Sequence, residues 1–254
     1  MLNQEQMDEF AERGFLVVPQ VVGRDLLAAA SGAIDRLIER DPPGPEVRGP
    51  HFYFPETARV PEFGALLTDS AAFALAESLT APGTLEHPWQ TQVALNIPPH
   101  PQRPGMHHID GALYEPDGRP GTFTMLVGVL MSDQLERDGG NLWVWPGTHL
   151  THARYFRDNG PEAFFTAAGY PPIALPEPEQ VTGRAGDLLL AHYLLGHNIG
   201  DNVSPAVRRA VYFRVKRTGH DPRWRAFLQD PWLDYDRVRE RTAPTAPTAP
   251  AERP

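Results

Sequence analysis

The chain is organised around one stretch of six residues, Met106-His107-His108-Ile109-Asp110-Gly111. In an extended backbone, side chains two residues apart project from the same face, so His108 and Asp110 point together while Ile109 points away. Such a pair, joined by one more histidine, makes the two-histidine, one-carboxylate set that holds non-haem Fe(II). A bare His-x-Asp is a weak signal in a chain with ten histidines, so a partner elsewhere in the sequence has to support it.

That support comes from a segment further along the chain. The run Gly186-Asp187-Leu188-Leu189-Leu190 predicts a buried strand, His197 follows it, and Arg208 opens another apolar strand. His197 is therefore a candidate third ligand. His192 lies inside the first strand and is a rival for the same role.

The composition excludes several classes of function. Hydrophobic residues make up 41% and charged residues 22%, which is ordinary for a globular protein, and there are no cysteines for disulfides or thiolate metal sites. The net charge of −9 argues against nucleic acid as a partner. No apolar run approaches the length of a membrane span, and the polar N-terminus lacks a signal-peptide pattern. We expect a cytoplasmic protein whose partner is a small molecule, as a monomer or a dimer.

The pattern of apolar residues predicts a mainly β protein with flanking helices. Helices are expected at 4–13, 24–40 and near 73–79, and a first short strand at 15–19. Further strands are expected at 90–97, 123–131, 142–145, 179–183, 187–193 and 207–216. Their spacing suits an antiparallel barrel or a jelly roll of two sheets, braced by the N-terminal helices. We expect one domain over residues 1–241 and a disordered Thr-Ala-Pro tail over 242–254.

The order of these motifs resembles the phytanoyl-CoA dioxygenase family. The resemblance covers roughly residues 5–217 and includes the His-x-Asp, Gly139-Gly140-Asn141-Leu142, Pro146-Gly147-Thr148-His149 and the downstream segment from Gly186 to Arg208. It implies a double-stranded β-helix, or cupin-like jelly-roll, core. It also implies that Fe(II), 2-oxoglutarate and O₂ are used.

Carried over residue by residue, the resemblance assigns a site. His108, Asp110 and His197 would be the catalytic iron ligands, and Arg208, eleven residues after His197, would bind the far carboxylate of 2-oxoglutarate. Asn202 and Ser204 match polar residues that the family often shows between those two, so they are further cofactor-binding candidates.

Strand alternation bears on which of two neighbouring arginines would bind the far carboxylate of 2-oxoglutarate. If Arg208 faces the site, Ala210 and Tyr212 share that face and Arg209 points to the other. The opposite phase stays open, because apolar residues follow Arg209 at the same spacing. His107, next to a predicted ligand but on the opposite face, is expected to be structural or to face the substrate.

The resemblance implies an oxygenase that activates a C–H bond, most simply by hydroxylation, with release of succinate and CO₂. Because Asp110 keeps the carboxylate ligand, no coordination position is left for chloride, and halogenation is disfavoured. Two alternatives remain open. One is an iron-dependent, cupin-type dioxygenase that does not use 2-oxoglutarate, and the other is a catalytically silent jelly-roll binding module.

Aromatic residues suggest where a substrate would bind. The connection 150–171 is rich in aromatic residues and is expected to be a lid or binding loop, facing a second aromatic loop at 51–55. His149, Trp143, Phe54 and Phe164 are the substrate-binding candidates. The scarcity of basic residues in these two segments favours a free, largely apolar, natural-product-like molecule over a CoA thioester. In the alternative interpretation, these rings form a small core of their own.

Overall fold

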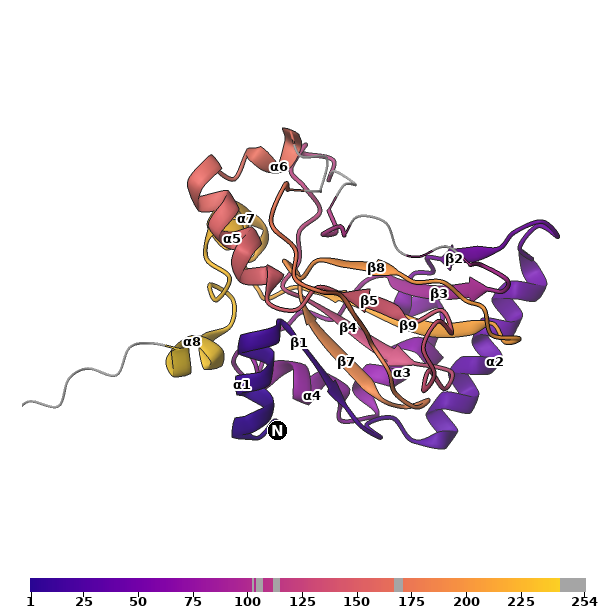
Figure 1. Ribbon diagram of the computed structural model, residues 1–254. Coiled ribbons are helices and arrows are strands. Elements are labelled where there is room, and N and C mark those ends of the chain that lie inside the picture. The colour runs from indigo at the N-terminus through magenta and orange to yellow at the C-terminus, as the bar shows by residue number, and fades with distance from the viewer. Residues whose placement is uncertain (102, 104–106, 112–114, 167–170, 243–254) are drawn as a thin grey trace, which may run out of the picture.

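The computed structural model describes residues 1–101, 103, 107–111, 115–166 and 171–242. Two antiparallel sheets form its centre (Figure 1). The larger sheet has the strand order β1 (Phe15–Val18), β7 (Leu188–His192), β4 (Met125–Leu130), β9 (Arg208–Val215), β3 (Thr91–Ile97) and β2 (Gly49–Tyr53). The smaller sheet has the order β6 (Glu179–Gln180), β5 (Leu142–Val144) and β8 (His197–Ile199). Both sheets are open, so the core is not a closed barrel.

The N-terminal helices brace the larger sheet, as predicted. Helix α1 (Gln4–Arg13) begins at a capping box formed by Asn3 and Gln6 and ends at Gly14. Helix α2 (Arg24–Arg40) ends just before the proline-rich turn and buries an apolar stripe. The guanidinium of Arg209, on β9, lies 2.7 Å from the carboxylate of Asp35, on α2. Helix α2 therefore covers the face of the sheet to which Arg209 points.

Short helices fill the remaining connections. Before β3 they are η1 (Thr57–Arg59), α3 (Pro61–Thr68) and α4 (Ala72–Glu77), and after β9 they are η2 (Asp221–Arg223), α7 (Trp224–Gln229) and α8 (Asp236–Thr242). Helix α8 lies beside α1 (Figure 1), and Arg241 forms an ion pair with Asp8 there. Helix α8 ends where the tail was expected to begin, and residues 243–254 lie outside the described residues.

The prediction of a long loop over 150–171 is wrong. Helix α5 (Thr148–Asn159) and helix α6 (Ala163–Thr166) occupy most of it. Helix α5 buries His149, His152, Ala153 and Phe156, which is the spacing of one helical face. That spacing is visible in the sequence, but the aromatic content outweighed it in the prediction. Residues 167–170 lie outside the described residues.

The second aromatic segment also differs from its prediction as a loop. His51, Phe52 and Tyr53 belong to β2, an edge strand that pairs with β3 along its whole length. Pro50 is tolerated there because an edge strand can leave one hydrogen-bonding side unpaired. Phe54 follows the strand and is 50% exposed.

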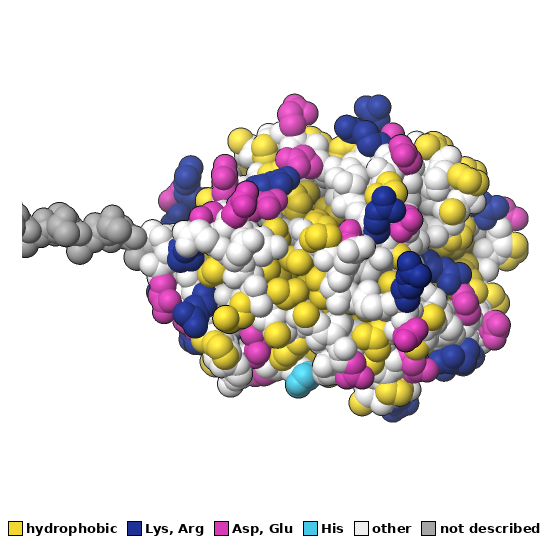
Figure 2. Space-filling view, turned by 90° about the horizontal axis from the view of Figure 1, so that it is seen from below, with side chains coloured by type: hydrophobic (Ala, Val, Ile, Leu, Met, Phe, Trp, Pro, Cys, Tyr) yellow, Lys and Arg dark blue, Asp and Glu magenta, His cyan; other side chains and the backbone are white. Residues whose placement is uncertain are grey.

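The surface below the larger sheet mixes both signs of charge. Figure 2 shows Lys and Arg side chains interspersed with Asp and Glu around hydrophobic side chains on that face. Among the described residues, this face therefore carries no single concentrated area of positive charge. Within the described part of the chain, no helix has the length and apolar character needed to cross a bilayer.

Candidate active site

The two histidines of the predicted metal set lie opposite each other on neighbouring extended segments. The backbone N–H of His108 donates to the carbonyl of His197 at 2.9 Å, and the N–H of His197 donates to the carbonyl of His108 at 3.0 Å. Asp110 is two residues further along, and its Oδ1 lies 3.6 Å from His108 Nε2 and 3.7 Å from His197 Nε2. One candidate ligand atom from each residue lies within 4.8 Å of the others. Backbone pairing thus brings together side chains that are distant in the sequence.

The protonation states of the histidines suit metal binding. His197 Nδ1 lies 3.0 Å from the carbonyl oxygen of Leu195, so this nitrogen carries the proton and donates it. The lone pair of His197 is then on Nε2, which faces Asp110. Burial lowers the pKa of His108, and the neighbouring His197 lowers it further. A neutral imidazole at neutral pH is the form that binds metals.

Asp110 is held on two sides. Arg214 Nε donates to Asp110 Oδ2 at 2.9 Å, and Arg214 Nη2 lies 2.8 Å from the same oxygen. The hydroxyl of Tyr193 donates to the backbone carbonyl of Asp110 at 2.9 Å. Burial raises the pKa of Asp110, but the charge of the neighbouring Arg214 guanidinium outweighs burial and helps to hold the pKa well below its usual range. The carboxylate is therefore ionised.

Arg214 was missed in the sequence analysis, although the sequence contains a signal for it. Strand alternation that places Arg208 on the inner face also places Arg214 there, three alternations further along β9. What the sequence alone does not reveal is that Asp110 lies next to that end of the strand.

Arg208 is buried, and part of its guanidinium has no hydrogen-bond partner among the described residues. The residue is 2% exposed, and its Nε donates to the carbonyl of Gly140 at 2.6 Å. Its Nη1 and Nη2 are buried without a hydrogen-bond partner among the described residues. Arg209 pairs with Asp35 on the opposite face of the sheet, so the two arginines point in opposite directions and Arg208 is the one directed inward.

The strand face next to Arg208 combines short side chains with a further polar group that has no partner among the described residues. Ala94 and Ala210 lie opposite each other on β3 and β9, and neither side chain extends beyond a methyl group. The hydroxyl of Tyr212, on the same face, is also buried without a partner among the described residues. Buried polar groups without partners cost free energy, so this combination indicates a site for a polar ligand.

The other cofactor-binding candidates are engaged in a turn. Asn202 Nδ2 donates to the carbonyls of Asn96 and Ala206, and Ser204 Oγ donates to Asn202 Oδ1 at 2.7 Å. These bonds hold the connection between β8 and β9.

The rival ligand His192 has both ring nitrogens occupied. Its Nε2 lies 2.7 Å from the carbonyl of Pro231, and its Nδ1 accepts from the N–H of Leu194 at 2.9 Å. His192 is therefore held in the core, away from His108 and Asp110.

Two of the four substrate-binding candidates, His149 and Phe164, lie in the interior. His149 is 0% exposed with Nε2 3.2 Å from the carbonyl of Ala11, and Phe164 is 1% exposed. Trp143, on β5, is half-buried. His107, on the opposite face from His108, is buried with Nε2 3.1 Å from His152 Nε2. Of the four substrate candidates, Phe54 is the one that lines the cavity described next.

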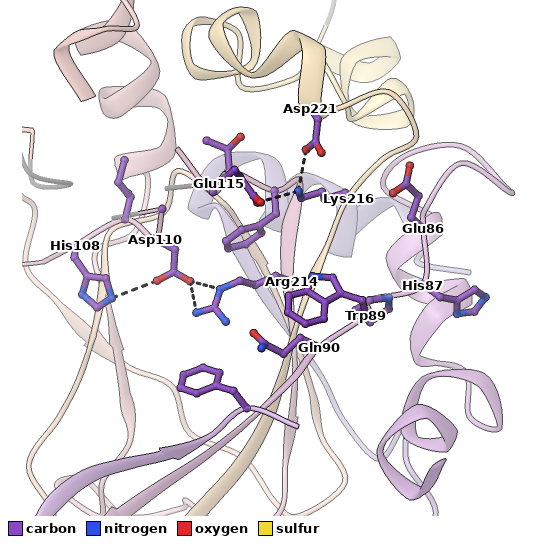
Figure 3. A pocket seen from close by; sticks show the side chains of 17 residues that line it. Glu86, His87, Trp89, Gln90, His108, Asp110, Glu115, Arg214, Lys216 and Asp221 are labelled. Carbon is purple, nitrogen blue, oxygen red and sulfur yellow. Dashed lines mark hydrogen bonds and ion pairs between the residues drawn. The ribbon is translucent and has the colours of Figure 1, made fainter. Parts of the chain in front are cut away.

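A cavity of about 750 Å³ opens onto His108 and Asp110 (Figure 3). Its aromatic lining residues are Phe54, His87, Trp89 and Phe123. Its charged lining residues, besides Asp110, are Glu86, Glu115, Arg214, Lys216 and Asp221. Figure 3 shows Arg214 pointing at Asp110, while Lys216 points toward Glu115 and Asp221. The cavity therefore combines aromatic surface with fixed charges next to the candidate metal ligands.

Comparison with known proteins identifies the family. The phytanoyl-CoA dioxygenase (PhyH) family matches residues 10–210. The chain belongs to this family. The family and enzyme class predicted from the motifs are thereby confirmed. Among curated relatives, an ectoine dioxygenase of Streptomyces avermitilis is 24% identical over 85% of this chain and 80% of its own length, and one from Streptomyces anulatus is 23% identical over 82% and 76%.

Solved structures share the fold. HygX from Streptomyces hygroscopicus, with nickel and 2-oxoglutarate bound, has a TM-score of 0.60 at 21% identity, covering 86% of this chain and 88% of its own. The epimerase SnoN, in complex with Fe³⁺, alpha-ketoglutarate and nogalamycin RO, has a TM-score of 0.58 at 23% identity, covering 89% of each chain. These similarities confirm the predicted jelly-roll core. SnoN contains iron and both neighbours contain 2-oxoglutarate, which are the metal and the co-substrate predicted for this chain.

Proposed function

We propose that this protein is an Fe(II)- and 2-oxoglutarate-dependent oxygenase that hydroxylates a small, natural-product-like molecule. The observation that carries the proposal is the convergence of His108, Asp110 and His197, with ligand atoms within 4.8 Å of one another, beside the cavity. Two neutral imidazoles and one carboxylate suit Fe(II) and leave open coordination positions. The overall change would be R–H + 2-oxoglutarate + O₂ → R–OH + succinate + CO₂.

The residues of the site fit both iron and 2-oxoglutarate. His108, Asp110 and His197 would hold the iron, and the unpartnered Nη1 and Nη2 of Arg208 would hold the far carboxylate of 2-oxoglutarate. When bound, iron and 2-oxoglutarate supply the oxidising chemistry. The chain's own contribution is to hold Asp110 ionised, to keep the histidine lone pairs directed inward and to orient the substrate in the cavity.

The cavity refines the expected substrate. Exposed Trp89 and Phe54 offer apolar surface at its edge, being 72% and 50% exposed. Glu86, Arg214 and Lys216 add polar contacts that a purely hydrocarbon molecule would leave unused. The proposal is therefore a molecule with an apolar face and several polar groups. The protein would act in the cytoplasm on a free small molecule, without nucleic acid or membrane as a partner.

The test is substrate-stimulated formation of succinate. Purified protein with Fe(II) and 2-oxoglutarate would be screened against acyl-CoA esters and free natural products of mixed polarity, with mass spectrometry of the products. We expect succinate and a product heavier by one oxygen atom for a free molecule. Turnover of CoA esters alone would refute the substrate class. The absence of any 2-oxoglutarate turnover, together with substrate oxidation, would favour a cupin-type dioxygenase.

The role of Arg208 has its own test. Replacing a buried, charge-assisted carboxylate contact costs about 2–4 kcal/mol, or roughly 30- to 1000-fold in affinity. We expect Arg208→Gln to weaken 2-oxoglutarate binding by such a factor and to leave metal affinity nearly unchanged. Arg209→Gln is the matched control. It removes a neighbouring arginine from the same strand, and this arginine pairs with Asp35 on the outer face. The opposite ranking of the two variants would refute the assignment.

A further inference from the structure

We propose that Arg214 is a positioning residue that restricts Asp110 to binding the metal through one oxygen. This inference rests on the proposed function, since it concerns the same metal site. It goes beyond that function by assigning a role to a residue outside the ligand set.

The two oxygens of Asp110 face different partners. Oδ2 accepts from Arg214 Nε at 2.9 Å and lies 2.8 Å from Arg214 Nη2, whereas Oδ1 lies 3.6–3.7 Å from the Nε2 atoms of His108 and His197. A carboxylate oxygen has about two lone-pair directions for accepting hydrogen bonds. Both lone pairs of Oδ2 face the guanidinium of Arg214, so Oδ1 is the oxygen that remains for a metal.

The supports around Asp110 are rigid. Arg214 extends from β9, which pairs with β3 on one side and β4 on the other, and its guanidinium lies over the ring of Phe123 at 5.7 Å. The Tyr193 hydroxyl fixes the backbone of Asp110 from another direction. The carboxylate is thus held at both its backbone and its outer oxygen. A side chain restrained in this way stays ordered before the metal arrives.

A one-oxygen contact matters for the proposed reaction. A carboxylate that bound through both oxygens would occupy a position that 2-oxoglutarate or O₂ needs. Arg214 also lines the cavity, so the competing interpretation is that it simply contacts the substrate. A third effect, plain charge repulsion between a guanidinium and a divalent cation, would make Arg214 unfavourable for metal binding. These three effects predict different results.

The experiment measures Mn(II) binding by calorimetry, without 2-oxoglutarate or substrate, to wild type, Arg214→Gln, Arg214→Lys and Lys216→Gln. Loss of a group that orients a metal ligand typically weakens metal affinity by about 10- to 100-fold. We expect a loss in that range for Arg214→Gln and an intermediate loss for Arg214→Lys, which keeps the charge but offers one nitrogen. Lys216→Gln removes a positive charge from the same cavity and should leave metal affinity unchanged or slightly increased.

The outcomes separate the possibilities. An unchanged or increased metal affinity of Arg214→Gln would overturn the inference, as would normal metal affinity with a raised substrate KM. A wild type that binds no metal would overturn the proposed function itself, together with this inference. If Arg214→Gln does not fold, as judged by circular dichroism, the comparison of Arg214→Lys with wild type decides the question alone.

Discussion

His220 and Asp234 form a hydrogen bond of 2.5 Å in the interior, where their side chains are 1% and 0% exposed. Thr124 Oγ1 and Arg223 Nη2 also donate to this carboxylate, each at 2.8 Å. On its other side, the His220 ring lies 2.9 Å from the hydroxyl of Thr122, which lines the cavity. The network therefore ties the C-terminal segment to the wall of the candidate active site.

Removal of Asp234 should destabilise the whole fold. Asp234→Ala leaves the buried donors of His220 and Thr124 and the partly exposed guanidinium of Arg223 without their acceptor. Removing one partner from a buried ion pair costs about 3–5 kcal/mol. Asp236→Ala, which removes a partly exposed ion pair with Arg217, should cost no more than about 1 kcal/mol. Urea unfolding of both variants measures the difference. Equal costs would show that the network contributes little.

The choice of third ligand can be tested by a pair of histidine variants. We expect His197→Ala to stay folded but to lose metal binding and turnover. His192→Ala should keep metal affinity while losing stability, because His192 stacks on Tyr235 at 4.8 Å and bonds to the carbonyl of Pro231. Calorimetric metal titration and thermal melting separate these effects. Metal binding lost in His192→Ala and kept in His197→Ala would reverse the assignment.

Gly111, directly after the proposed carboxylate ligand Asp110, should not tolerate a side chain. Its φ is 106°, and a Cβ there would lie 2.9 Å from the Tyr193 hydroxyl and 3.0 Å from Phe164. We expect Gly111→Ala to cost about 1–3 kcal/mol from crowding, beyond the backbone strain, and to weaken metal binding by displacing Asp110. Gly118→Ala is the control, because Gly118 also has a positive φ but a Cβ there would meet none of the described residues within 4 Å. Equal losses in the two variants would mean that backbone strain alone is responsible.

Acid should destabilise the protein well before its carboxylates are protonated. Burial lowers the pKa of His152 and of His192 from 6.5 to about 3. The unfolded state takes up these protons at a higher pH than the folded state does. The stabilisation contributed by these two neutral histidines is therefore fully present above pH 6.5, and it is lost as the pH falls from 6.5 toward about 3. We expect the melting temperature to fall steadily between about pH 7 and pH 4.5, and less steeply in His152→Gln. A constant melting temperature over that range would contradict this expectation.

Much of the fold was predictable because local periodicity reports it directly. The helices at 4–13 and 24–40 have the predicted bounds, and most strands lie within a few residues of their expected limits. The pairing of His108 with Asp110 followed from the two-residue repeat of an extended chain. The stretch that forms helix α5 carries two conflicting patterns, because its buried face has helical spacing while its clustered aromatic residues are typical of a binding loop.

The sequence by itself determined which side chains share a face within each element. It did not determine what each face meets, because that depends on contacts between segments far apart in the chain. Only the tertiary structure placed His197 opposite His108, enclosed His192 in the core and directed Arg209 toward Asp35. It also brought Arg214 to Asp110, a contact between residues 104 positions apart that no local pattern encodes. The types of the candidate ligands were therefore set by the sequence, and their arrangement by the packing of the two sheets.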